Sequence, residues 1–187
     1  KLAKNDFLPT GPCDTRELWE KITARSLNRP IHDSLVCHGT HPVRAEGAKN
    51  LPLLRAVAGP QQASFTDKAL HDFTHSIYTL TPDCDRMACR LAGPIIETVR
   101  GSDILSDGIA AGSVQVSTNG QPIVMLADHQ TTGGYAKIAT VISADLPMLA
   151  QLRPGQSVCF TFVTPQQAVQ AARRQAELLQ AVAARLD

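Results

Sequence analysis

The chain has 187 residues, with 18 Lys and Arg against 17 Asp and Glu, and 43% of its residues are hydrophobic. This length suffices for one domain or two small ones and can bury roughly 70% of the unfolded surface. The formal charge of +1 supplies no basic field for nucleic acid or an anionic membrane, and the hydrophobic content argues against disorder. No apolar run approaches the ~18 residues of a membrane-spanning helix. We therefore expect a globular protein without nucleic-acid or membrane partners.

The N-terminal segment, residues 1–50, is predicted to be a partial domain or linker with one short helix at Thr15–Leu27. The rest of this segment is rich in Pro, Gly and His, which is typical of loops. Cys37, His38 and His41 are possible metal ligands, but this short cluster has no distant partner. We expect no metal site there.

Residues 51–164 are predicted to form the main domain, because short β-branched segments and turns follow one another there. The expected strands are Leu53–Val57, Ile77–Leu80, Met87–Leu91, Ser113–Val116, Pro122–Ala127, Lys137–Ile142 and Ser157–Val163. A short helix begins after Thr66, a plausible N-cap, and Asn119-Gly120 marks a hairpin turn. Short strands without long intervening helices indicate a mainly antiparallel sheet or a closed barrel.

Residues 165–187 are predicted to form a C-terminal helix, with Thr164 as N-cap and Pro165 at the first helical position. Apolar residues recur at spacings of three and four, which gives the helix one apolar stripe. The stripe is explained either by a helix that lies on its own domain or by a helix that binds a partner.

The five cysteines are odd in number, irregularly spaced and without a CxxC pair. A disulfide framework is therefore not expected, and a reducing cytoplasm fits best. Cys159 lies in an apolar strand and should be buried. His71 and His75 are spaced to share one helix face, but without a third ligand we expect exposed side chains rather than a zinc site.

The unusual feature is the polar segment 128–137, which joins two apolar strands and is predicted to be a loop. Polar groups on a loop between rigid strands commonly form a binding site. Gly133 and Gly134 can adopt positive φ and so direct N–H groups at an anionic or carbonyl oxygen. Asp128 can accept or move a proton, and Lys137 adds charge. The alternative is a long hairpin loop whose Asp and Thr side chains cap their own backbone.

Several ordered motifs resemble one family: LRAVAGPQ, CDRMACRL, DGI, GSVQV, NGQPIV, DHQTTGGYAKIATVISADL and LRPGQSV, between Leu53 and Val163. This family is the biotin-dependent carboxyltransferase subunits, also called allophanate hydrolase subunit 2 or urea amidolyase-related proteins, and it includes the free-standing C component of 5-oxoprolinase. The resemblance implies a mainly β fold, a cyclophilin-like barrel with a few peripheral helices. Family chains are considerably longer, so the sequence corresponds to a C-terminal portion.

The resemblance also implies a function: a hydrolase subunit that acts with a homologous partner, either of the allophanate hydrolase subunit 1 type or like the B component of 5-oxoprolinase. The 5-oxoprolinase complex uses ATP to open 5-oxoproline to glutamate, and urea carboxylase moves a carboxyl group from carboxybiotin to urea. The implied substrate is a small amide or lactam. The sequence has no nucleotide-binding motif, so ATP is expected at the level of the complex, and biotin would arrive only on another chain.

Carried over onto this sequence, the family motifs place catalytic roles on Asp128, Lys137 and Gln115. Substrate-binding roles fall on Arg86, Gln121, Gln130, Thr131, Thr132, Gly133, Gly134 and Tyr135. Such a pocket would polarise an amide and stabilise its developing oxyanion.

The sequence departs from the family pattern at three places. Ala88-Cys89 stands where Gly-Tyr is usual, His129 replaces an Arg, and Ala136 replaces a Pro. Loss of the Arg removes a permanent anion donor, because His is charged only below about pH 6.5. The other functions left open are a regulatory module that antagonises a kinase inhibitor and the carboxyltransferase component of a biotin-dependent urea carboxylase.

Overall fold

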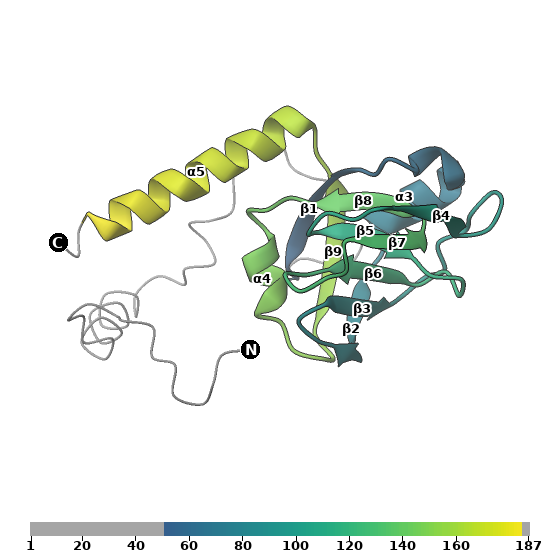
Figure 1. Ribbon diagram of the computed structural model, residues 1–187. Helices are drawn as coiled ribbons and strands as arrows, with labels where there is room; N and C mark the ends of the chain where they lie inside the picture. The colour runs from purple at the N-terminus through teal and green to yellow at the C-terminus, as the bar shows by residue number, and fades with distance from the viewer. Residues whose placement is uncertain (1–50, 185–187) are drawn as a thin grey trace. The chain divides into compact units, whose positions relative to one another are not determined.

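The computed structural model describes residues 51–184 and shows a closed β-barrel (Figure 1). Around the barrel the strand order is β1-β8-β5-β6-β3-β2-β9. These strands are β1 (Leu53–Ala58), β2 (Tyr78–Cys84), β3 (Ala88–Ala92), β5 (Ser113–Val116), β6 (Pro122–Met125), β8 (Lys137–Val141) and β9 (Ser157–Phe162). Every neighbouring pair is antiparallel except β1 and β9, whose parallel pairing closes the barrel. The mainly β barrel predicted from the sequence is confirmed.

A separate two-stranded ribbon and a few helices complete the described part of the chain. The ribbon pairs β4 (Asp103–Gly108) with β7 (Thr132–Tyr135) in antiparallel register. The helices are α3 (Asp67–His75), α4 (Leu146–Ala150) and α5 (Pro165–Ala183), and a 3-10 turn spans Gln62–Ser64. The predicted helix Thr15–Leu27 and the Cys37, His38 and His41 cluster lie outside the described residues.

The core fills the inside of the barrel and the space under α3. Phe73 of α3 stacks on Phe160 of β9 with ring centroids 4.5 Å apart, and Tyr78 packs against both rings. All three side chains are fully buried. Because aromatic side chains bury the largest apolar areas, this cluster is a main source of the domain's stability. Cys159 is also fully buried, as predicted.

The turn and cap signals in the sequence are found where they were predicted. Thr66 Oγ1 accepts a hydrogen bond from the Ala69 N–H at 3.0 Å, so it caps α3. Thr164 Oγ1 accepts from the Gln167 N–H at 3.2 Å at the start of α5. Gly120 has φ of 75°, the left-handed conformation that its turn between β5 and β6 requires.

One expectation about a loop was wrong, and two elements were not predicted. The polar segment 128–137 is not a loop throughout: its second half is β7, paired with β4. Neither β4 nor the short helix α4 was expected. Strand β4 is exposed along most of its length and is held by its pairing with β7, so it lacks the alternating apolar pattern of a core strand.

Helix α5 begins at the predicted residue but is only partly covered. Ala171 is buried, and the Gln175 side-chain amide donates to the Ala144 carbonyl at 3.5 Å, so the helix contacts the barrel domain. Val169, Leu178 and Leu179 remain exposed. Both interpretations of the stripe therefore remain predictions. Within residues 51–184, no helix combines the length and apolar character needed to span a bilayer.

Removal of the central aromatic ring should destabilise the domain. Phe73→Ala is expected to lower the free energy of unfolding by about 3–5 kcal/mol, because it deletes a fully buried ring from a packed cluster. Leu105, which is 94% exposed on β4, is the matched control, and Leu105→Ala should change stability by no more than about 0.5 kcal/mol. Urea unfolding followed by circular dichroism measures both, and equal effects would contradict this account of the core.

Candidate functional site

The candidate site lies where the β4–β7 ribbon covers β5 and β8 of the barrel. Gln115 of β5 and Lys137 of β8 are cross-strand partners, so their side chains project from the same side of the sheet. Val114 and Val116, the neighbours of Gln115, belong to the barrel core, so Gln115 points outward from it. The ribbon lies over this outer face, because the Gln115 side-chain amide donates to the Tyr135 carbonyl at 3.2 Å.

Lys137 is buried beneath the ribbon and paired with an acid on it. Its side chain is 3% exposed, and Nζ donates to Oδ2 of Asp107 on β4 at 2.7 Å. Asp107 is 51% exposed, so the pair has one member inside the fold and one at the surface. The Lys137 ammonium is thus covered by the ribbon, whereas the Asp107 carboxylate is accessible to solutes.

The amide of Gln61 holds both members of this pair in place. Gln61 Nε2 donates to Asp107 Oδ2 at 3.1 Å, and Gln61 Oε1 accepts from the Lys137 backbone N–H at 3.1 Å. Neither Asp107 nor Gln61 was assigned to the site from the sequence, although both lie within motifs that resemble the family. The DGI motif contains Asp107 and the GPQ motif contains Gln61, so these two motifs were the sequence signal that could have assigned both residues to the site.

The carboxyl of Asp107 is held in its ionised form. The hydrogen bond from Lys137 is the largest cause, and the Gly108 N–H and the Gln61 amide add to it, so the pKa of Asp107 lies below its ordinary value of 3.8. At neutral pH this group is therefore a hydrogen-bond acceptor and a weak base. It suits binding of an N–H donor better than removal of a proton.

Gly133 lies in close packing between the ribbon and the barrel and does not adopt positive φ. The expectation that Gly133 and Gly134 form a positive-φ nest is wrong: neither is among the positive-φ glycines of the described chain, and both lie in β7. A Cβ at Gly133 would lie 2.6 Å from Ile109 Cδ1 and 3.0 Å from Gln115 Nε2. The missing side chain thus lets the ribbon approach the barrel where Gln115 is buried.

A second ion pair joins two connections between strands. Arg86, in the turn between β2 and β3, donates from Nε to Asp128 Oδ2 at 2.7 Å and from a terminal nitrogen to Oδ1 at 3.3 Å. Arg86 is 84% exposed and Asp128 48%. The Asp128 N–H also donates to the Arg86 carbonyl at 3.1 Å. The turn around Arg86 and the start of the polar segment are thus joined through backbone and side chain.

The other predicted site residues fall into two groups. Gln130 and Thr131 lie on the connection between β6 and β7, together with Asp128, and Thr132 begins β7. Gln130, Thr131 and Thr132 are exposed. Gln121 instead donates to the Gly93 carbonyl at 3.0 Å and accepts from the Gly93 N–H at 2.8 Å. Its side chain therefore joins the start of β6 to the end of β3.

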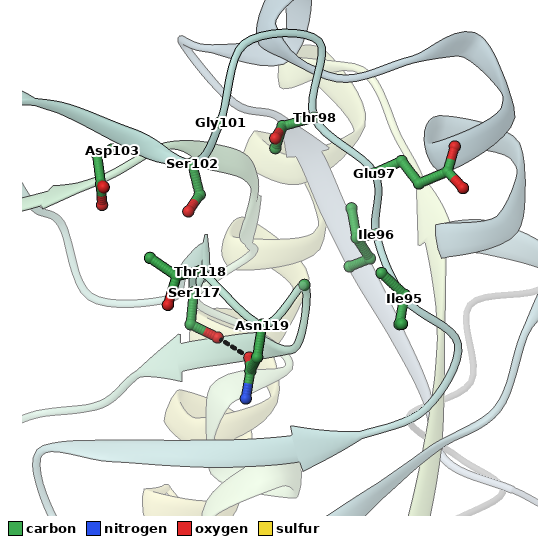
Figure 2. A pocket seen from close by; sticks show the side chains of 11 residues that line it. Ile95, Ile96, Glu97, Thr98, Gly101, Ser102, Asp103, Ser117, Thr118 and Asn119 are labelled. Atoms are coloured by element: carbon green, nitrogen blue, oxygen red, sulfur yellow. Dashed lines mark hydrogen bonds between the residues drawn. The ribbon is translucent and has the colours of Figure 1, made fainter.

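A hollow of about 490 Å³ lies between the segment 95–103 and the turn 117–120 (Figure 2). Ser117 donates to the Asn119 side-chain oxygen at 2.5 Å and so closes one wall of it. None of the predicted site residues lines this hollow. The candidate site is therefore built from the Lys137–Asp107 pair under the ribbon and the Arg86–Asp128 pair between two strand connections, not from this space.

Potential metal ligands do not gather in the described part of the chain. Residues 51–184 contain no group of three or more His, Cys, Asp or Glu side chains placed to hold a metal ion. His71 and His75 do share one helix face, as predicted, and their rings stack with centroids 3.8 Å apart.

The fold and site define a class: a closed β-barrel domain with one ion pair between the barrel and its outer ribbon and a second ion pair between two strand connections. The comparison with known families is more specific. Residues 1–162 match the family described as carboxyltransferase domain, subdomain A and B, and the chain belongs to it. The resemblance found in the sequence motifs is confirmed.

Among curated proteins, the chain is similar to the C component of 5-oxoprolinase from two bacteria. It is 40% identical over 146 residues to the protein of Haemophilus influenzae and 39% identical over 148 residues to that of Escherichia coli. The matches cover 76% and 77% of this chain and 47% of each relative, so the chain spans about half the length of these proteins.

Two solved structures show the same fold at low sequence identity. The urea carboxylase of Kluyveromyces lactis is 22% identical with a TM-score of 0.64, and the match covers 67% of this chain and 12% of that one. The urea amidolyase of K. lactis is 20% identical with a TM-score of 0.64, over 78% of this chain and 9% of that one. At this identity the likeness supports the barrel architecture.

The Lys137–Asp107 ion pair should make stability depend on pH. The pKa of Asp107 is lower in the folded state than its ordinary value of 3.8. The ionised carboxylate therefore contributes its full stabilisation at pH values above 3.8, and this contribution is lost as the pH falls through the lowered pKa. Asp107→Asn should lower Tm at neutral pH and flatten the decline of Tm in acid. Thermal unfolding from about pH 7 to about pH 2.5 measures both effects.

Asp103 on the same strand supplies the control. It is exposed, and no ion pair involves it within residues 51–184. Asp103→Asn should leave both Tm and its pH dependence near those of the wild type. An acid decline that is equally steep in Asp107→Asn and the wild type would show that the Lys137 pair contributes nothing to the fold.

Proposed function

We propose that this chain is part of a protein equivalent to the C component of 5-oxoprolinase, which acts in a complex that cleaves a small amide or lactam at the expense of ATP. The observation that carries the proposal is the 40% and 39% identity to two proteins of that name, over about three quarters of this chain. The ion pairs beside the ribbon supply the matching chemistry.

A lactam presents one N–H donor and one carbonyl acceptor, and the proposal assigns one partner to each. The carboxylate of Asp107 is exposed and ionised, so it can accept the substrate N–H. The guanidinium of Arg86 is the exposed cation of the second pair, and it can donate to the carbonyl or to an oxyanion that develops there. Asp128 holds that guanidinium and, when released from it, serves as acceptor or base.

Lys137 acts on the substrate through Asp107. Its ammonium is buried and already donates to the carboxylate, so a substrate on the surface contacts Asp107 first. The positive charge keeps Asp107 ionised and fixes the carboxylate oxygen that faces the substrate. Gln115 and Gly133 hold the ribbon in place, and Tyr135 anchors it through its carbonyl.

We expect the other components of the reaction at the level of the assembled complex. The sequence contains no P-loop or dinucleotide motif, so ATP is placed at the level of the complex. The expected partner is a homologous protein like the B component of 5-oxoprolinase, and the enzyme is a hydrolase only when assembled with it. The cysteine pattern supports a cytoplasmic location.

The direct test is activity of the assembled complex. The protein that carries this chain should be co-expressed with the candidate partner proteins, and glutamate release from 5-oxoproline should be measured with and without ATP. The wild-type complex is expected to release glutamate only with ATP. Asp107→Asn and Arg86→Gln are each expected to lower turnover about 100-fold, because each removes a group that contacts the amide.

Asp103→Asn is the matched control, since it removes a neighbouring exposed carboxylate from the same strand, and it should retain wild-type turnover. Copurification of the partner proteins and an unchanged circular dichroism spectrum show that each variant assembles and folds. A complex that assembles but releases no glutamate would reject the proposed reaction. Unchanged turnover in Asp107→Asn and Arg86→Gln would reject only the proposed residues.

A carboxyltransferase role is the second candidate, and the description of the matched family favours it. In that case a carboxyl group would move from carboxybiotin on another chain to a small amide such as urea. Incubation of the complex with a biotin carboxylase, biotinylated carrier, ATP, labelled bicarbonate and urea would then give labelled carboxyurea. Glutamate release without such labelling separates the two functions.

A further inference from the structure

Two cysteines face each other across the β2–β3 hairpin that carries Arg86. Cys84 ends β2, Cys89 lies near the start of β3, and the two are direct cross-strand partners. The Cys84 thiol donates to the Arg90 carbonyl at 3.5 Å, and both cysteine side chains pack on the barrel core. Both are free thiols. The proposed function uses neither of them.

The hairpin geometry is that of a pair that can be bridged. The Asp85 N–H donates to the Ala88 carbonyl at 3.0 Å, so Asp85 and Ala88 form the hydrogen-bonded pair next to the turn. Cys84 and Cys89 occupy the next position of the ladder, which is a non-hydrogen-bonded pair, with Cα atoms about 4.5 Å apart in such pairs. This spacing lies within the range of about 4.4–6.8 Å found for disulfides.

We propose that Cys84 and Cys89 form a reversible disulfide across the β2–β3 hairpin, made by exchange with a low-molecular-weight disulfide such as oxidised glutathione. The Cys84 thiolate attacks one sulfur of the small disulfide, and the first thiolate of that disulfide leaves. The Cys89 thiol then loses its proton, its sulfur attacks Cys84 Sγ, and the second small thiolate leaves. Two protein thiols are oxidised and one small disulfide is reduced to two thiols, so atoms and electrons balance.

The environments of the two thiols set the order of these steps. Cys84 is half-buried and can meet an oxidant, whereas Cys89 is 4% exposed. Burial, and then the proximity of Cys84, raise the pKa of Cys89 to about 12, so Cys89 stays protonated and does not react first. Once Cys84 is in the mixed disulfide it carries no charge, and its part in raising the pKa of Cys89 disappears.

The disulfide would act on the hairpin that presents Arg86. The closed ring runs from Cys84 to Cys89 and contains Arg86 and Met87, whose carbonyls accept from the Asp128 and Leu126 N–H groups at 3.1 and 2.9 Å. Oxidation restricts the motion of this turn relative to the two strands. We therefore expect slower hydrogen exchange at Asp128 and Leu126 in the oxidised protein.

The test is peptide mapping of the full chain. The protein is treated with oxidised glutathione and quenched with acid, its remaining thiols are alkylated, and it is digested with trypsin without reductant. Trypsin cleaves after Lys68, Arg86 and Arg90, so the expected product is peptide 69–86 linked to peptide 87–90 and separated by reduction. Cys159→Ser should give the same product, because Cys159 lies elsewhere in the fold. A wild-type protein in which Cys84 ends as a glutathione adduct, or in which both thiols are alkylated, overturns the proposal.

The single variants test the order of attack without requiring the disulfide. Cys89→Ser should trap glutathione on Cys84, and Cys84→Ser should leave Cys89 unmodified. The reverse pattern, with glutathione on Cys89, would contradict the mechanism. Thermal unfolding shows whether each variant is folded. Since the readout is a covalent bond and not turnover, it is independent of the proposed amide-cleaving function.

Discussion

The arrangement of the candidate site depends on the burial of one ammonium group. Lys137 lies on a barrel strand, yet its side chain is 3% exposed, and a charge in that position requires a partner. Asp107 is that partner, and it lies on β4, which belongs to the ribbon and not to the barrel. The need to pair Lys137 therefore holds β4 against β8, and the pairing of β4 with β7 brings the polar segment to the same face.

The ribbon approaches the barrel closely, and this constrains the size and the hydrogen bonding of the residues between them. Gln115 must be nearly fully buried and must still use its polar atoms, and it does so by donating to the Tyr135 carbonyl. A Cβ at Gly133 would displace the ends of the Ile109 and Gln115 side chains, which lie against this glycine. These residues are thus explained by packing as well as by chemistry. A polar residue in a sequence motif need not touch substrate to be required.

The sequence predicted the parts of the fold that are determined locally or by the apolar core. Thr66 and Thr164 cap helices through their own neighbouring amides, and Gly120 serves its turn by positive φ, so each signal is contained in a few residues. Strands β4 and β7 escaped prediction because each is stabilised mainly by the other, and their residues are mostly exposed or half-buried. Asp107 was missed because its partner Lys137 lies 30 residues away along the chain, so no local pattern indicates the pair.

The two ion pairs differ in burial, and this difference separates their roles. In the Lys137–Asp107 pair the ammonium is buried and the carboxylate is exposed. Asp107 is therefore a hydrogen-bond acceptor that the buried Lys137 holds in place and keeps ionised. In the Arg86–Asp128 pair both groups are accessible, and an exposed pair contributes little to stability. Little free energy is therefore needed to separate Arg86 from Asp128. The proposed function uses this difference: Asp107 would be the fixed acceptor for the N–H of a small amide, and Arg86 would be the donor to the charge that grows on its oxygen.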